Sequence, residues 1–258
     1  MDLVLIGIVA LLTSLLTFIS GFGLGTLLMP VFALFLPIQT AISLTAIVHF
    51  LNNIFKLLLI GKAAKRDIII RFGLPAIAGA AVGAYLLSRL MNAGTLYSYS
   101  LGKFHADVSV LNFLIGVLII LFAILELKPV GFRQSGKVAG PLLAGGLISG
   151  FFGGLSGHQG ALRSAFLIKL NLTKEAFIAS GIVIATMVDV TRLSIYFSRI
   201  DLVLLSENIT YLVVGTLSAF AGAIAGRFLL KKVTLAFVHV FVAAALFILG
   251  ITVIAGIV

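Results

Sequence analysis

The stretch that decides the fold is FISGFGLGTLLMP, residues 18–30, where Gly21, Gly23 and Gly25 interrupt a run apolar enough to cross a bilayer. Glycine in a helix interior costs about 1 kcal/mol relative to alanine, so this spacing predicts a break in the helix. A second stretch, GLSGHQGALRSAFL at residues 154–167, repeats the pattern. A broken helix inside the membrane is therefore expected twice in this chain.

Composition indicates an all-α integral membrane protein. The 258 residues are 61% hydrophobic and 10% charged, with a mean hydropathy of +1.27. Apolar runs recur that match the ~20 residues a helix needs to span the hydrocarbon, and no long period-2 alternation indicates a barrel. The net charge of +10 is read as topology information, because no basic segment is interleaved with aromatics as in nucleic-acid binding. Without cysteine, no disulfide or thiolate metal site is expected, and no cofactor.

The chain also resembles two copies of one unit within a single membrane domain, 1–258. Ser-Gly at 20–21 recurs at 156–157, and Asn53 with Lys56 is echoed by Asp189 with Arg192. AGAAVGAYLL at 78–87 is similarly echoed by AGAIAGRFLL at 221–230. We predict repeat one at 1–127 and repeat two at 138–258, joined by a basic cytoplasmic connector at 128–137. Each repeat would hold a re-entrant broken-helix hairpin and three transmembrane helices.

The distribution of basic residues predicts that the second repeat is inverted. If each broken segment returns to its own side, ten Lys and Arg share one face against three on the other, as the positive-inside rule requires. If the first arm of each hairpin crosses fully, the division is seven against six. The inverted scheme is therefore preferred, with both termini outside. The ten are Lys62, Lys65, Arg66, Lys128, Arg133, Lys137, Lys169, Lys174, Lys231 and Lys232; the three are Arg89, Lys103 and Arg199.

Two hairpins entering from opposite faces would bring both glycine-rich tips near the midplane. Irregular backbone is tolerated there only when protein or a wet cavity surrounds it. Helix N-termini at Thr26 and Ala161 would then direct unpaired N–H groups at a shared space. Such a space favours an anion.

These features resemble the TauE/SafE family of sulfite exporters over nearly the whole chain. The carriers of the resemblance are the duplicated halves, SGFGLG at 20–25, and the basic loop GKAAKRD at 61–67. The resemblance implies a multi-helix transporter of sulfite, organosulfonates or related sulfur anions. The second break, SGHQGALR at 156–163, departs from the family pattern because His158 and Gln159 replace small residues, which suggests more side-chain recognition there.

Ionisable and polar groups within the spans are the candidate site, because each is costly in lipid unless paired or hydrated. Arg163 could hold an oxyanion through two hydrogen bonds, or could only brace its hairpin. Asp189 and Arg192 are three residues apart and can pair, or Asp189 can couple transport to protons. His49, Asn52, Asn53 and Lys56 form a polar stripe on one helix. The expected substrate-binding set is Ser20, Gly21, Gly23, Gly25, His49, Asn52, Asn53, Ser156, Gly157, His158, Gln159, Gly160 and Arg163, with Lys56, Asp189 and Arg192 as coupling or ion-pair residues.

Three functions are open from the sequence, all for a multi-pass protein of the cell membrane whose partners are lipid and a small sulfur-containing anion. The leading hypothesis is a secondary transporter that exports sulfite or a small organosulfonate by alternating access. A passive anion channel would share every site feature. The sequence G-L-S-G at 154–157 also matches the nucleophile context of rhomboid-type intramembrane serine proteases, but its duplicate at Ser20 has no second catalytic set. We expect no enzyme activity.

The glycine motifs GAAVG at 79–83 and GAIAG at 222–226 allow helices to approach closely. Two interpretations remain for them, a seam between copies in a homodimer and packing between the two halves of one chain.

Overall fold

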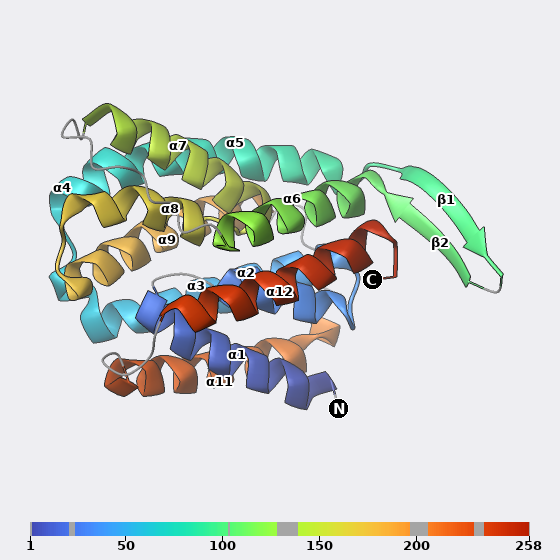
Figure 1. Ribbon diagram of the computed structural model, residues 1–258, viewed down its shortest axis with the longest axis horizontal. Helices are drawn as coiled ribbons and strands as arrows, with labels where there is room; N and C mark the ends of the chain where they lie inside the picture. The colour runs from blue at the N-terminus through green and yellow to red at the C-terminus, as the bar shows by residue number, and fades with distance from the viewer. Residues whose placement is uncertain are drawn as a thin grey trace.

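The computed structural model describes residues 2–20, 24–102, 104–127, 139–196, 206–229 and 235–257. Long helices lie alongside one another in a bundle, and a β-hairpin projects from one end (Figure 1). The N- and C-terminal ends of the chain lie at the end of the bundle that carries the hairpin, and α4 lies at the opposite end. The described part of the chain is thus helical apart from its loops and this hairpin.

The elements of the first half follow the apolar runs of the sequence. The predicted run 39–60, for example, is a helix from Ile38 to Ile60. The elements are α1 (Asp2–Ser20), α2 (Leu24–Ala33), α3 (Ile38–Ile60), a 3₁₀ turn (Gly61–Ala63), α4 (Arg66–Ile68), a π-helical turn (Ile69–Gly73), α5 (Leu74–Leu90), β1 (Thr95–Leu101), β2 (Phe104–Ser109) and α6 (Val110–Leu127).

The second half repeats this order without a hairpin in its described residues. Its first helix ends at Ser156 and the next begins at Gly160, with Gly157 at a φ of 81° between them. This left-handed conformation is readily adopted by glycine, which explains why the chain turns there. The elements are α7 (Ala139–Ser156), α8 (Gly160–Leu167), a 3₁₀ turn (Ile168–Leu170), α9 (Lys174–Tyr196), α11 (Ile209–Leu229) and α12 (Leu235–Ile254).

Helix length and hydropathy confirm the all-α membrane class. Within the described ranges, four helical segments are long and apolar enough to cross a bilayer. Other apolar helices in the same ranges are shorter. The four are Ile38–Ala63, Arg66–Leu90, Lys174–Tyr196 and Ile209–Phe228.

The sequence reading did not include the β-hairpin, which occupies the loop expected between residues 91 and 110. β1 and β2 pair antiparallel, with Tyr99 opposite Ala106. The hydroxyls of Tyr97 and Tyr99 each donate a hydrogen bond, both 2.6 Å long, to the carbonyl oxygens of Ile254 and Ala255. The hairpin therefore covers carbonyl groups at the C-terminal end of α12, where a helix has no internal donors left.

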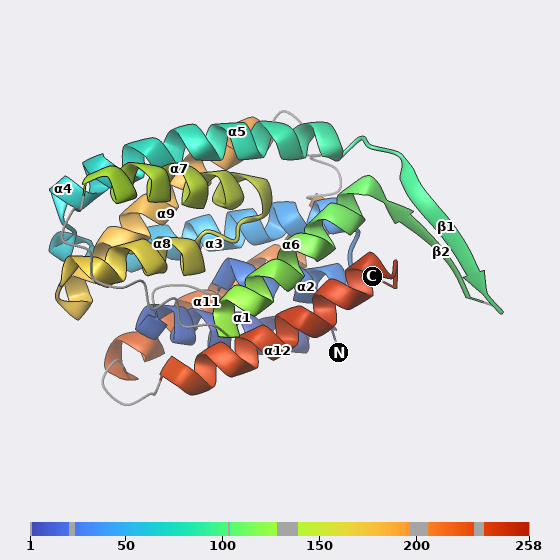
Figure 2. The ribbon, with the colours of Figure 1, turned by 45° about the horizontal axis from the view of Figure 1, so that its top comes forward.

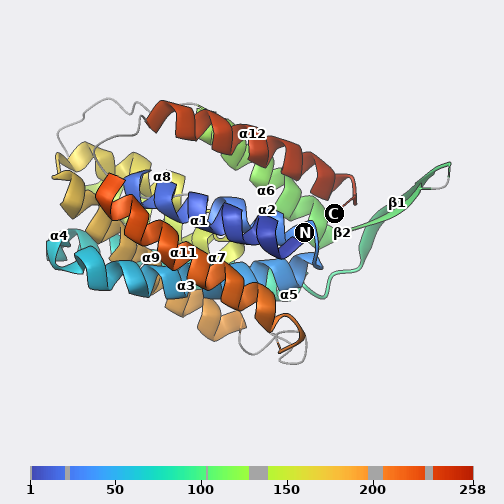
Figure 3. The same ribbon diagram turned by 90° about the horizontal axis from the view of Figure 1, so that it is seen from below.

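Helices of the first half pack against helices of the second. α1 lies along α11 (Figure 3), α5 along α7, α3 along α9 and α6 along α12 (Figure 2). An ideal Cβ placed on Gly83 would lie 2.9 Å from the nitrogen of Leu155, and one on Gly222 would lie 2.9 Å from the carbonyl carbon of Leu11. Both glycine motifs therefore face helices of the same chain, so these two stretches are not available as a seam between copies.

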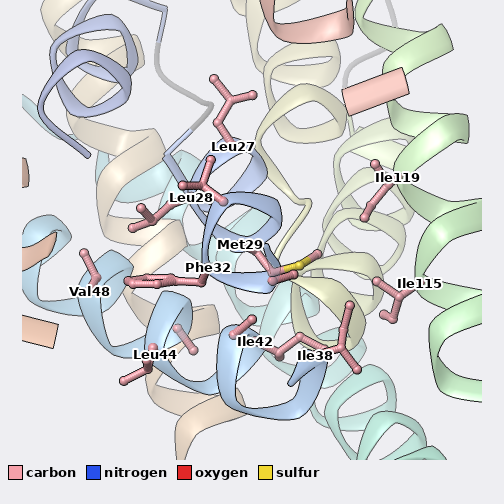
Figure 4. Close-up of a cluster of buried hydrophobic side chains, with 14 of the residues drawn as sticks. Leu27, Leu28, Met29, Phe32, Ile38, Ile42, Leu44, Val48, Ile115 and Ile119 are labelled. Carbon is pink, nitrogen blue, oxygen red and sulfur yellow. The ribbon is translucent and has the colours of Figure 1, made fainter. Parts of the chain in front are cut away.

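The short helix α2 is held by apolar packing. Its side chains lie between α3 and α6 (Figure 4), and Leu28 and Phe32 are fully buried. This packing fixes the second arm of the first broken segment, although Pro30 removes one backbone donor from it. The contributing side chains are Leu27, Leu28, Met29 and Phe32 from α2, Ile38, Ile42, Leu44 and Val48 from α3, and Ile115 and Ile119 from α6.

Candidate functional site

A buried polar cluster lies where α3 and α9 pack together. Asn53 and Asp189, which the sequence comparison of the two halves predicts to correspond, are in direct contact: Asn53 Nδ2 donates to Asp189 Oδ2 at 2.8 Å. His49 Nδ1 lies 2.7 Å from the same oxygen. Arg192 contacts the other oxygen, Oδ1, through Nε at 3.0 Å and Nη2 at 2.8 Å. Both oxygens of the Asp189 carboxylate are therefore occupied.

The first turn of α2 and the turn after α7 lie against this cluster. An ideal Cβ on Gly25, in the first turn of α2, would lie 3.4 Å from His49 Cδ2 and 3.5 Å from the Gly157 carbonyl oxygen. An ideal Cβ on Gly157 would lie 2.7 Å from Arg192 Nη1. A side chain at Gly157 would thus displace the guanidinium. The start of α2 and the end of α7 meet beside the charges of α3 and α9.

The second break presents buried polar atoms. His158 Nδ1 lies 3.0 Å from both the carbonyl oxygen and the Oγ of Ser156, and the ring stacks on Phe122 with centroids 5.2 Å apart. Among the described residues, His158 Nε2 and both amide atoms of Gln159 have no hydrogen-bond partner. An unsatisfied buried polar group costs about 1–3 kcal/mol, so such a group calls for an explanation such as a bound ligand.

Arg163 extends from α8 toward α9. It is 4% exposed, and an ideal Cβ on Gly181 would lie 3.3 Å from its Nε. Its guanidinium is close enough to interact electrostatically with Asp189. The absence of a side chain at Gly181 therefore leaves room for the arginine beside α9.

Asn52 and Lys56 face a different direction from His49 and Asn53. Lys56 Nζ donates to the Ser14 carbonyl oxygen of α1 at 3.3 Å and lies 5.9 Å from the centre of the Phe18 ring. The Asn52 amide is assigned with its oxygen toward Lys56 Nζ at 3.1 Å and its nitrogen toward the Ala219 carbonyl oxygen at 3.2 Å. The predicted polar stripe is thus divided between α9 on one side and α1 with α11 on the other.

The buried charges do not balance. Among the described residues beside the breaks, Arg163 and Arg192 carry two positive charges against the carboxylate of Asp189, which leaves an excess of +1 without counting the histidines. Charges buried from water interact strongly because the effective dielectric constant is low. The cluster is therefore electropositive, and its chemistry suits an anion.

The remaining predicted residues are placed as follows. Gly21 and Gly23 lie outside the described residues, and Ser20 is the last residue of α1, with its side chain also outside that description. Gly160 is buried and begins α8. The Ser156 hydroxyl is buried and donates to the Phe152 carbonyl oxygen at 3.2 Å.

Tyr196 is a member of the cluster that sequence reasoning missed. It is fully buried, and its hydroxyl donates to the Gly154 carbonyl oxygen of α7. Its position seven residues after Asp189 and four after Arg192 places it on the same face of α9. This spacing could have identified Tyr196 from the sequence as a neighbour of Asp189 and Arg192. Phe122, which stacks on His158, had no such signal because the residues around it in α6 are apolar.

The fold and the cluster together define a helical multi-pass membrane protein with charged groups buried where the start of α2 meets the end of α7, an arrangement typical of membrane transporters. The chain matches the family model described as sulfite exporter TauE/SafE over residues 6–253, and it belongs to that family. None of the curated proteins compared with the chain matches it. Members of the family are transporters rather than enzymes, so the Ser156 and His158 contact is not assigned as a protease nucleophile and base.

Proposed function

We propose that this chain is a secondary transporter that exports sulfite or a small organosulfonate through a site between its two helix breaks. The observation that carries the proposal is the excess of buried positive charge beside Gly25 and Gly157, where the breaks meet. A small oxyanion would compensate that charge. It would also accept hydrogen bonds from the Arg163 guanidinium and the Gln159 amide, since guanidinium groups match the geometry of paired oxyanion oxygens.

The directions of the helices support an inverted repeat. In Figure 1, α1 starts at the end of the bundle that carries the hairpin, whereas α7 starts at the α4 end and runs the opposite way. The equivalent residues Asn53 and Asp189 touch each other, which is expected for positions near a two-fold axis. Two inverted halves around one site are the usual architecture for alternating access.

The basic residues support an orientation with the α4 end in the cytoplasm. Lys62, Lys65 and Arg66 lie between α3 and α5 at that end. The backbone nitrogen of Lys65 donates to Ser180 Oγ at 2.9 Å, so the same end holds the start of α9, where Lys174 lies.

The test is flux of sulfite, sulfate and methanesulfonate in proteoliposomes, measured for the native chain, Arg163→Ala and the control Arg89→Ala. Arg89 is exposed and its guanidinium binds the Tyr85 hydroxyl of its own helix. We expect saturable flux of sulfite or methanesulfonate that accelerates when the anion is present on both sides. Loss in Arg163→Ala with retention in Arg89→Ala supports the site. Equal flux in both variants would remove Arg163 from it, and non-saturable flux without exchange would indicate a channel.

A further inference from the structure

The contacts of His49 define where a proton can bind in the cluster. Its Nδ1 lies 2.7 Å from Asp189 Oδ2, which can only accept, and 3.1 Å from Asn53 Nδ2, which donates to that same oxygen at the shorter distance of 2.8 Å, so we assign the hydrogen to Nδ1. The opposite ring nitrogen, Nε2, then holds a free lone pair. The carboxylate itself already accepts contacts from His49, Asn53 and Arg192, so a proton on Asp189 would displace one of these donors.

The ring atoms of His49 nearest the first turn of α2 are Cδ2 and Cγ, which an ideal Cβ on Gly25 would approach to 3.4 and 3.8 Å. Nε2 is bonded to Cδ2. Within the described part of the chain, Nε2 makes no hydrogen bond. The His49 side chain keeps 10% exposure, against 0% for Asp189 and 2% for Arg192. His49 is therefore the most open member of this charged group.

The charges around His49 make its protonation depend on an anion. Lys56 on its own helix points toward α1, and α9 contributes Asp189 and Arg192, which neutralise each other. Arg163 on α8 and His158 at the second break are basic. From the neighbouring α2, the residue that approaches His49 is Gly25, which carries no charge. A proton on His49 thus adds to an existing positive excess unless an anion is bound. By linkage, an anion that favours the imidazolium must itself bind more tightly to it.

We propose that His49 Nε2 takes up one proton with each anion, and that the chain moves the two together in the same direction. This inference rests on the proposed anion transport. The step is a proton transfer from water to Nε2 on one side of the membrane and back to water on the other, with no other bond made or broken. With a monovalent sulfonate the transported pair carries no net charge.

The experiment uses proteoliposomes of the native chain with methanesulfonate, which is a fully ionised anion at every pH used and so brings no proton of its own. A trapped pH dye reports protons while labelled methanesulfonate reports the anion. We expect one proton per anion, faster flux as the pH falls, and no response to an imposed potassium diffusion potential. Methanesulfonate flux without proton movement would overturn the inference alone. No flux of either methanesulfonate or sulfite would instead refute the proposed function.

Three variants test the residue. His49→Asn keeps a donor toward Asp189 and removes Nε2, and we expect the proton-to-anion ratio to fall from one to zero. His105→Asn on the exposed hairpin is the matched control and should keep a ratio of one. If the ratio is lost in His158→Asn but kept in His49→Asn, His49 is the wrong residue.

A binding measurement covers the case in which His49→Asn does not fold. The native protein in weakly buffered detergent should take up about one proton for each methanesulfonate bound, seen as a rise in pH. Binding without that rise would overturn the inference.

Discussion

Replacing Gly83 by alanine tests the close approach of α5 and α7. An ideal Cβ at this position lies 2.9 Å from both the nitrogen of Leu155 and the carbonyl carbon of Phe151, and the Phe151 oxygen is nearer still. Ordinary contact begins at 3.4 Å, so the helices must separate by at least 0.5 Å at this point, and by more at the oxygen. The atoms that block the Cβ belong to the backbone and cannot move by a change of rotamer.

The expected loss of stability depends on how many close backbone contacts the interface between α5 and α7 contains. Gly150 and Gly154 on α7 approach the backbone of Ala76 and Ala80 in the same way. A gap of 0.5–1 Å removes roughly a quarter to a half of each van der Waals attraction across it. We expect Gly83→Ala to lower the free energy of unfolding by about 3 kcal/mol, the upper end for overpacked sites.

Unfolding of the purified protein, followed by helical circular dichroism during titration of mild detergent with sodium dodecyl sulfate, measures the change. Gly94→Ala is the matched control, because an added Cβ there meets nothing within 4 Å. It should unfold at the native midpoint. A Gly83→Ala protein as stable as the Gly94→Ala protein would refute the close contact between α5 and α7.

Three further substitutions separate structural from functional roles. Asp189→Asn leaves Arg192 buried without its carboxylate and should lower stability by about 3–5 kcal/mol, whereas Asp107→Asn on the exposed hairpin should not; equal thermal midpoints for the two would contradict the pairing. Lys56→Met should leave stability unchanged or raise it, because no carboxylate of the described residues lies within ion-pair distance of Lys56. A marked fall in its melting temperature would contradict this reading. Gln159→Leu removes two buried polar atoms without partners in the described chain, so it should keep stability while weakening methanesulfonate binding about tenfold, measured calorimetrically; unchanged affinity would exclude Gln159 from the site.

The helices could be predicted from the sequence because bilayer thickness fixes the length of an apolar run. The expected run 209–230 corresponds to a helix from Ile209 to Leu229, and the break expected near residue 157 lies between α7 and α8. The hairpin was missed although Thr95–Leu101 alternates in the manner of a strand. Its anchoring depends on Tyr97 and Tyr99 reaching α12, a contact that no local pattern encodes.

The sequence predicted which residues of α3 belong to the candidate site, but it did not predict which helices their side chains contact. His49, Asn52, Asn53 and Lys56 share one face of α3, yet two of them contact α9 and the other two contact the α1 and α11 side. The periodicity of a helix predicts which face of the helix a side chain occupies, but such a face is about 100° wide and can contact more than one neighbouring helix. Which neighbouring helix each side chain contacts is decided by how the two halves of the chain pack, and that packing involves positions far apart in the sequence.

The pairing of α1 with α11 has a consequence for how the protein is made. α1 is complete at Ser20, but the helix whose Gly222 approaches its backbone begins only at Ile209. At ribosomal rates of 5–20 residues per second, the interval is on the order of 10–40 s. Throughout that time the newly inserted α1 has only lipid or early helices to cover the surface reserved for its late partner. Biogenesis of this chain therefore includes a waiting period that is set by the order of the helices along the sequence rather than by the speed of helix formation.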